Sequence, residues 1–318
     1  MYFPVAGIEV NPLVPPLTAF AISLCTSMGG VSGAFLLLPF QVSVLGFHTP
    51  AVSSTNQLFN IVAIPSGVWR YIKEGRMVWP LTWVVIIGTL PGVLIGAYLR
   101  VRYLPDPRAF KLFAGLVLLY IGGRMLWALL RLGKPNMQAQ RTEEAFQQRM
   151  RQHSERQTAR GAKPTLPQAV TKRFDCTRVV YEFFGQEFSL SAPGIMALSL
   201  IVGLVGGVYG IGGGAIIAPF FVSVFGLPVY TVAGAALMGT FVTSVAGVLF
   251  YLAMAPLYPG MAIAPDWGLG LLFGLGGFAG MYCGARLQKH VPAAAIKWLL
   301  AGCILFTALK YVSGFFLH

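Results

Sequence analysis

The stretch "GGVSGAFLLLPF" (residues 29–40) lies inside an apolar segment that otherwise has the composition of a membrane helix. It places three glycines and one proline within eleven residues, counted from Gly29 to Pro39. In a helix interior, glycine costs about 1 kcal/mol relative to alanine, and proline costs about 3 kcal/mol. The motif therefore predicts that the helix is interrupted here.

The composition of the whole chain is that of an all-α polytopic membrane protein. Of its 318 residues, 56% are hydrophobic and only 10% are charged, whereas a soluble domain carries about 25% charged residues. Long apolar runs approach the ~20 residues that a membrane-spanning helix requires. We expect hydrophobic segments at residues 14–46, 50–70, 79–99, 109–131, 193–226, 229–252, 267–287 and 293–316.

The two membrane halves are internal repeats of four main hydrophobic segments each. When residues 30–71 are shifted by 180 positions, they align with residues 210–251 without a gap. The shift places the opening motif on a twin, "GIGGGAIIAPF" (residues 210–220), so the interruption is predicted in both repeats. Glycines at every fourth position, which predict close helix packing, also correspond: Gly88, Gly92 and Gly96 match Gly276, Gly280 and Gly284.

A basic, polar segment separates the repeats. We expect membrane repeats at residues 1–132 and 192–318, joined by a linker over residues 133–191. The linker holds ten Lys or Arg residues, and basic loops stay in the cytoplasm. Its first part predicts an exposed or membrane-surface helix, and "FDCTRVVYEFFGQEFSL" (residues 174–190) predicts a small β-hairpin. We attribute the net charge of +13 to this topology and to anionic lipid headgroups, not to nucleic-acid binding.

The interrupted segments leave two topologies open. A continuous helix of about 33 residues would be ~50 Å long, against a hydrocarbon core of ~30 Å. If each segment forms one broken span, each half has four spans and the repeats are parallel. If each segment enters the membrane and returns, the number of crossings is odd and the repeats are inverted. Loop charge favours the inverted arrangement, which places Arg70, Lys73 and Arg76 on the linker side and leaves Arg100, Arg102 and Arg108 opposite.

The two breaks are predicted to bind an anion. Broken helices at matching positions of two repeats indicate the binding site of a transporter. The helix after each break begins near Gly33 or Gly213, and its first amides lack intrahelical partners and carry the positive end of the helix dipole. Glycines allow an anion to approach such amides closely. The alternative is that both motifs serve helix packing and kinking alone.

Neighbouring helices supply polar and basic groups to this predicted site. Asn56 and Asn60 share one helix face, and Thr240 occupies the position of Asn60 in the second repeat. These side chains either bind substrate or bond neighbouring helices. Arg124 and Lys310, also at matching positions, either face the pathway or extend to the interface. The candidate substrate-binding residues are Gly29, Gly30, Ser32, Gly33, Asn56, Gln57, Asn60, Gly210, Gly212, Gly213, Gly214, Thr240, Thr243, Arg124 and Lys310.

The two glycine motifs and the helices of Asn60 and Thr240 resemble the TauE/SafE sulfite exporter family, also called the toluene-sulfonate uptake permeases. The resemblance covers both membrane halves. It implies movement of sulfur-containing anions such as sulfite, thiosulfate, sulfoacetate or other organosulfonates. Two features depart from the family pattern: Ser32 stands where glycine is common, and "STNQ" (residues 54–57) replaces a more usual run of small residues.

We therefore expect a secondary transporter of a small sulfur-containing anion that works by alternating access in a bacterial inner membrane. No metal, cofactor or enzymatic activity is expected, since the four histidines are dispersed and no metal-binding motif occurs. The absence of a P-loop excludes ATP as the intrinsic energy source, so coupling to protons or sodium ions is the alternative. An anion channel and, less favourably, an intramembrane enzyme are the competing functions; the sequence leaves the anion, the direction and the oligomeric state open.

Overall fold

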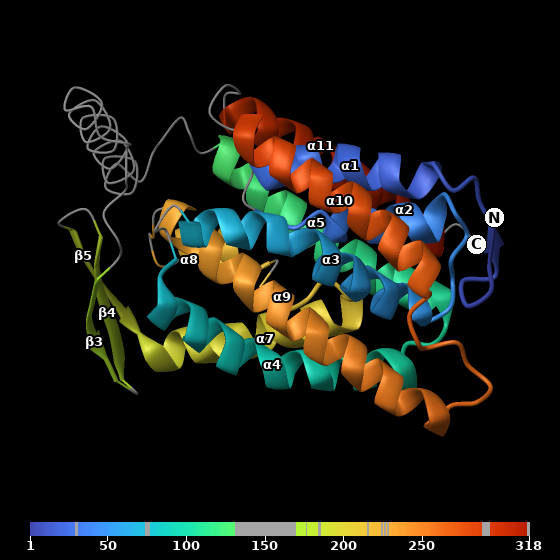
Figure 1. Ribbon diagram of the computed structural model, residues 1–318, viewed down its shortest axis with the longest axis horizontal. Helices are drawn as coiled ribbons and strands as arrows, with labels where there is room; N and C mark the ends of the chain where they lie inside the picture. The colour runs from blue at the N-terminus through green and yellow to red at the C-terminus, as the bar shows by residue number, and fades with distance from the viewer. Residues whose placement is uncertain are drawn as a thin grey trace.

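The apolar segments of the sequence form helices in the computed structural model, and a small β-sheet lies at one end of them (Figure 1). The expected class, an all-α polytopic membrane protein, is confirmed: among the described residues, four helices are long and apolar enough to cross a membrane. The structure describes residues 1–28, 31–73, 77–130, 170–175, 177–183, 186–214, 216–223, 225, 227, 229–287 and 293–316.

The elements follow the repeat in the sequence. The first part of the chain forms β1 (Tyr2–Phe3), β2 (Ile8–Glu9), α1 (Val14–Met28), α2 (Ala34–Ser43), α3 (Ala51–Lys73), α4 (Trp79–Arg102) and α5 (Pro107–Leu130). The second part forms β3 (Val170–Phe174), β4 (Arg178–Phe183), β5 (Gln186–Ser191), α7 (Ala192–Tyr209), α8 (Ile217–Ser223), α9 (Val229–Met254), the 3-10 helix η2 (Ala255–Leu257), α10 (Trp267–Leu287) and α11 (Ala293–Phe316).

Both glycine motifs interrupt their helices, as predicted. The first helix ends at Met28 and the next begins at Ala34; the second break separates Tyr209 from Ile217. After each break the chain turns back, so that α2 returns toward the end of the molecule that holds the termini and α8 returns toward the end that holds the β-sheet (Figure 1). Each motif thus forms a hairpin of two helices and not one broken rod.

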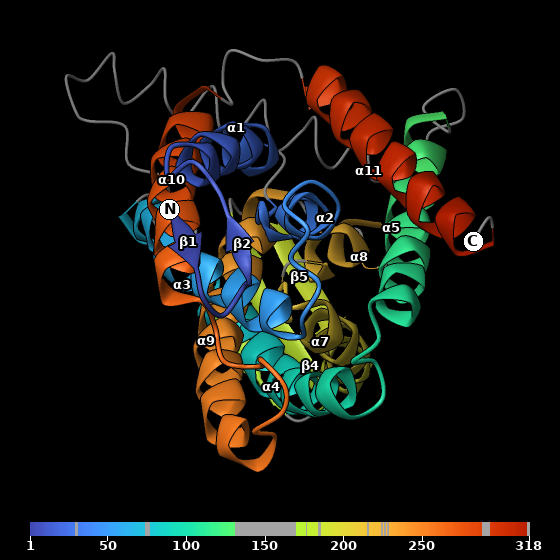
Figure 2. The ribbon, with the colours of Figure 1, turned by 90° about the vertical axis from the view of Figure 1, so that its right-hand side faces the viewer.

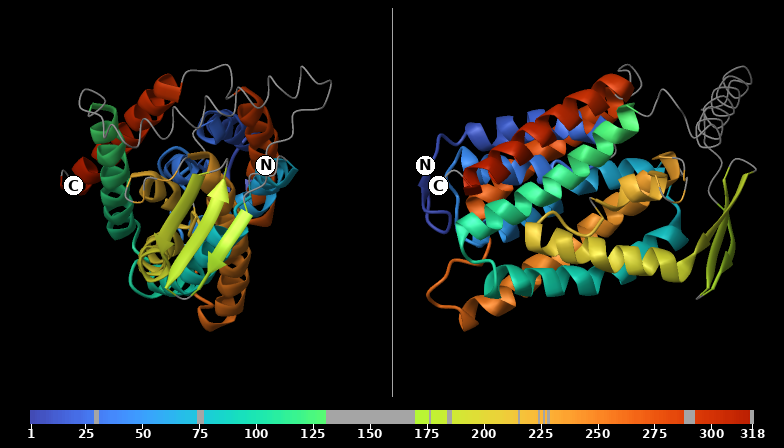
Figure 3. Two further views of the ribbon diagram at one scale, coloured as in Figure 1. Left: turned by 90° about the vertical axis from the view of Figure 1, so that its left-hand side faces the viewer. Right: turned by 180° about the vertical axis from the view of Figure 1, so that it is seen from behind.

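Corresponding helices of the two parts run in opposite directions along the long axis. Helices α1, α3 and α5 run toward the β-sheet end, whereas α7, α9 and α11 run away from it, as Figure 1 and the rear view in Figure 3 show. Helices α4 and α10 are opposed in the same way. Both chain termini therefore lie at the end opposite the β-sheet.

The glycine rows interlock the two halves. Helix α4 packs along α7, and α10 packs along α1, so each row faces the first helix of the other repeat. A Cβ atom at Gly92 would clash with the backbone of Leu200, and one at Gly276 would clash with the backbone of Pro16. This backbone contact is what small residues at every fourth position permit. Helices α3 and α9 contact each other between these pairs, and α5 and α11 form a further pair at one side (Figure 2).

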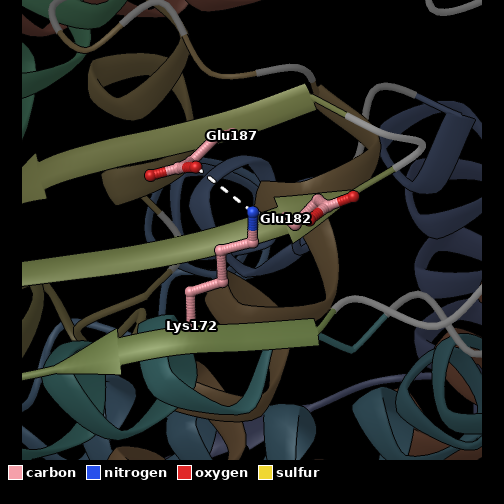
Figure 4. A network of polar contacts seen from close by, with 3 residues as sticks. All are labelled: Lys172, Glu182 and Glu187. Carbon is pink, nitrogen blue, oxygen red and sulfur yellow. Dashed lines mark hydrogen bonds and ion pairs between the residues drawn. The ribbon is translucent and has the colours of Figure 1, made fainter.

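The β-sheet lies where the sequence predicts a hairpin. Strands β4 and β5 pair antiparallel, and β3 adds to the free edge of β4. Lys172 on β3 lies 2.8 Å from a carboxylate oxygen of Glu182 and 3.3 Å from one of Glu187 (Figure 4). Hydrogen bonds to the carboxylates of Glu182, which has the larger effect, and Glu187 raise the pKa of Lys172. The helix predicted for the first part of the linker lies outside the described residues.

Candidate functional site

The two breaks meet in the interior of the protein, where two asparagines of α3 join them. Asn56 donates through Nδ2 to the carbonyl oxygen of Ala34 at 2.9 Å and to that of Gly210 at 3.1 Å. Ala34 begins the helix after the first break, and Gly210 ends the helix before the second. Asn56 therefore binds backbone from both breaks at once. Its Oδ1 accepts from Gln41 Nε2 on α2 at 3.3 Å.

Asn60, one turn further along α3, makes a second bridge. Its Nδ2 donates to the carbonyl oxygen of Ile211 at 3.0 Å and to Ser244 Oγ at 3.3 Å. Its Oδ1 accepts a short hydrogen bond of 2.6 Å from Ser32 Oγ in the first break. All three polar positions of the Asn60 amide are thus used within the protein. In the observed conformation, Asn60 therefore bonds neighbouring parts of the protein, which is one of the two roles that the sequence leaves open for it.

The second break depends on two left-handed glycines. Gly210 has φ 81° and Gly212 has φ 75°, conformations that side-chain-bearing residues rarely adopt. Gly210 ends α7, which is a common role for glycine at a helix C-terminus. Gly213 donates its amide to Thr243 Oγ1 on α9 at 3.0 Å. Repetition of glycine in this motif is therefore required by the backbone path itself.

The first break has a serine side chain at a position where the second break has a glycine. Ser32 stands at the position of Gly212, and its hydroxyl accepts from the amide of Ala34 at 3.3 Å. This contact satisfies one of the free amides at the start of α2, as a helix-capping serine does. The same hydroxyl donates to Asn60, so the departure from glycine at Ser32 is explained by a second role in joining the breaks.

The remaining members of the predicted site lie around these bridges. Gly33 faces α1, and a Cβ atom there would contact the Ser23 hydroxyl at 2.9 Å. Gly214 lies directly against the backbone of α9 at Ala236. Thr240 donates to the carbonyl of Ala236 in its own helix at 2.8 Å, so its hydroxyl hydrogen is used within α9 in this conformation. Gly29 and Gly30 lie outside the described residues.

Gln57 has no hydrogen-bond partner within the described part of the chain. Its side chain is fully buried, and neither Oε1 nor Nε2 is satisfied. It lies across Gly247 of α9, where a Cβ atom would collide with the amide group. A buried amide without partners costs about 1–3 kcal/mol for each unsatisfied group. Gln57 is therefore the predicted binding residue whose donors and acceptors are available to a ligand.

The interior around the breaks is closed in this conformation. The side chains of Ser32, Asn56, Asn60 and Thr240 have no solvent-accessible surface, so no water-sized space adjoins them. The anion site that the sequence predicts at the breaks is thus closed at these residues, because direct hydrogen bonds join the two motifs. A ligand would enter only after these bonds are exchanged.

Two predicted basic residues lie away from these bridges. Lys310 is exposed on α11. Arg124 lines a surface cavity of about 410 Å³ on α5 and places its guanidinium 5.7 Å from the ring centre of Phe220 on α8. Their assignment to the site is not supported by these positions, since both side chains extend to the protein surface as long basic chains do at an interface.

Several polar residues outside the predicted set of substrate-binding residues lie at or near the breaks. Ser53 donates to the carbonyl of Val208 at 3.3 Å, and Tyr209 donates to the carbonyl of Phe35 at 3.0 Å. Gln41 and Arg100 are buried in helices, and a buried amide or guanidinium in an apolar segment is a signal that the sequence does contain. The described helices hold no Asp or Glu; Asp106 and Asp266 stand directly before α5 and α10. None of the side chains that join the breaks is therefore a carboxylate.

A comparison with protein-family models gives one result. The model described as "Sulfite exporter TauE/SafE" matches residues 16–311, which is nearly the whole chain. Neither the search of curated proteins nor the search of solved structures found a match.

Proposed function

Because the chain belongs to the TauE/SafE sulfite exporter family, we propose that it is a secondary transporter of a small sulfur-containing anion. The substrate class is sulfite, thiosulfate, sulfoacetate or another organosulfonate. The observation that carries the proposal is that two broken helices of opposite direction meet in the interior, where Asn56 and Asn60 hydrogen-bond both breaks.

Alternating access is supported by the nature of these bonds. They link side chains of α3 to carbonyl groups of Gly210 and Ile211, which lie in the second break. Irregular backbone inside a membrane protein is tolerated where protein buries it or water reaches it. Water can donate to these carbonyls in place of the asparagines, and the asparagine amides can then donate to the oxygens of a substrate. The breaks would therefore separate without leaving carbonyls unpaired. The opposite directions of corresponding helices suit inverted repeats, in which such a change opens one side as it closes the other.

Charge supports an anionic substrate. The helices that the structure describes hold no carboxylate, the group that ordinarily binds a cation or relays a proton inside a membrane. Amide donors are supplied by Asn56, Gln57 and Asn60, and the first amide of α2, that of Ala34, donates to the Ser32 hydroxyl. A sulfonate or sulfite group presents several acceptor oxygens and needs such donors when it is removed from water.

We expect the melting temperature of the purified protein to differ clearly from one added compound to the next among sulfite, thiosulfate, sulfate, sulfoacetate, isethionate and taurine. A sulfur anion at one hundred times its Kd should stabilise the protein by about 2.7 kcal/mol. Saturable uptake and counterflow of the same anion in proteoliposomes would then distinguish a carrier from a channel. Stabilisation by none of these anions, combined with no flux, would rule out the proposed function.

The β-sheet end is proposed to face the cytoplasm, because α3 and α10 end there with basic last turns (Arg70, Lys73 and Arg286) and strand β3 is basic too. Basic segments next to membrane helices stay in the cytoplasm. In a cysteine-free background, we expect Arg108→Cys to react with a membrane-impermeant maleimide in intact cells. Ser189→Cys, on exposed β5, should react only after permeabilisation. Labelling in the reverse pattern would invert the orientation.

A further inference from the structure

Arg100 is a fully buried cation near the C-terminal end of α4. Its side chain has no accessible surface and is the largest fully buried side chain in the described part of the protein. Loop charge in the sequence suggests a residue at the membrane surface, but the structure places it among α3, α5 and α9. The idealised cost of removing a charged group from water is large, and several kcal/mol remain in real proteins. Such a group needs compensation.

The protein compensates the guanidinium only in part. Nε donates to Ser53 Oγ at 3.4 Å, and Nη1 donates to the carbonyl oxygen of Leu104. The ring of Phe110 lies below the group, with its centre 3.8 Å from Cζ. Nη2 has no partner, and no described carboxylate lies within ion-pair distance of Arg100. The described groups that contact the guanidinium are therefore all neutral, and its Nη2 is available as a donor.

A second unsatisfied donor faces the same group. Tyr251 of α9 lies next to Arg100 and Ser53, and its hydroxyl is buried without a hydrogen bond of acceptable geometry. Nη2 of Arg100 and the Tyr251 hydroxyl are thus two donors without acceptors at one buried positive charge, and both residues adjoin Ser53. A small oxyanion supplies what this group lacks: a negative charge and several acceptor oxygens.

The group is connected directly to the second break. Ser53, which accepts from Arg100, donates to Val208 in the last turn of α7. Gly210 lies against the backbone of Ser53 so closely that a Cβ atom there would clash with it. Arg100 is therefore one hydrogen-bonded residue away from the break, in the last turn of α4, and α4 ends on the side of the chain termini (Figure 1).

We propose that Arg100, with Tyr251, binds the transported oxyanion beside Ser53, on the termini side of the breaks. This inference rests on the proposed transport function and assigns a new residue to it. A small apolar cluster of Ala97, Val101, Tyr251, Met254 and Ile263 covers the site in this conformation, and its separation admits the anion. The matching position of Arg100 in the second repeat, at the shift of 188 that relates the glycine rows, is neutral Gln288. The sequence thus places this charge in the first repeat and a neutral amide at the matching position of the second.

Sulfite binding to the purified full-length protein tests the proposal. We expect Arg100→Gln to weaken sulfite binding about tenfold or more, because a charge-assisted contact is lost. Arg100→Lys keeps the charge but loses the planar donors, so its affinity should lie between those of the wild type and Arg100→Gln. The matched control is Arg102→Gln, an exposed arginine two residues away, which should leave sulfite affinity within twofold of the wild type.

A role of Arg100 in folding alone predicts a different result. Arg100→Gln would then melt at a lower temperature but bind sulfite with wild-type affinity, and that outcome overturns the proposal. If Arg100→Gln does not fold, Tyr251→Phe keeps the ring and removes only the hydroxyl. We expect it to bind sulfite at least about threefold more weakly; unchanged affinity would equally overturn the proposal. Failure of the wild type to bind any sulfur anion would instead refute the transport function itself.

Discussion

Gly92→Leu is expected to produce a large loss of stability, because Gly92 lies in the contact between the interlocked helices α4 and α7. Even a Cβ atom at this position would clash with the carbonyl of Leu200 and lie 2.7 Å from the amide nitrogen of Leu204 on α7. These are backbone atoms, which cannot rotate away as a side chain can. The two helices must separate, and overpacking of this kind costs about 1–3 kcal/mol or more. The thermal melting temperature of the purified protein measures the effect.

Two further variants make this test specific. Gly276→Leu, in the matching row, should be equally damaging because its Cβ atom would clash with the backbone of Pro16 on α1. Gly302→Leu is the control, since a Cβ atom there has no neighbour within 4 Å, and exposed substitutions usually change stability by less than about 0.5 kcal/mol. Wild-type melting of Gly92→Leu would show that α4 and α7 do not approach closely in the membrane.

The positions of the breaks could be predicted from the sequence because their causes are local. Left-handed backbone at Gly210 and Gly212 requires glycine, and that requirement is visible in one short motif. The approach of helices through Gly88, Gly92 and Gly96 is also visible, as a spacing. The spacing does not show which helix each glycine row packs against. The rows pack against the first helix of the opposite repeat, which is a property of the three-dimensional arrangement.

The chemistry at the site was less predictable for the same reason. Asn56 and Asn60 are marked as polar residues on one helix face, but the sequence cannot say that protein carbonyls occupy their donors. Arg100 appears near the end of a span, where a basic residue ordinarily reaches the interface. Its burial depends on Phe110 of α5 and Tyr251 of α9 closing over it. Such long-range contacts are set by tertiary packing, not by local composition.

Asn60→Leu is expected to have the second large effect, and it decides between two roles of this residue. Leucine has a similar volume but removes every polar contact of the amide. The carbonyl of Ile211 and the hydroxyl of Ser32 would then lose partners in a fully buried region. Each unsatisfied group costs about 1–3 kcal/mol, so a marked fall in melting temperature without ligand is expected.

The matched control is Thr240→Val, the same change of polarity at the twin position. The Thr240 hydroxyl donates to the carbonyl of Ala236 within the same helix. Loss of this bond should lower the melting temperature less, because the bond does not connect the two breaks. Comparable losses in the two variants would mean that Asn60 does not stabilise the meeting of the breaks.

Sulfite affinity of Asn60→Leu completes the test. If Asn60 only joins the breaks, the folded fraction binds sulfite as the wild type does, or more tightly, because a bond that holds the site closed has been removed. If the amide passes from Ile211 to the anion during transport, sulfite affinity falls about tenfold or more, roughly 1.4 kcal/mol. We expect the second result together with the loss of stability, since alternating access requires that a bond closing the empty site be replaced by one to the substrate. Unchanged affinity would limit Asn60 to a structural role and leave Gln57 and Arg100 as the donors to the anion.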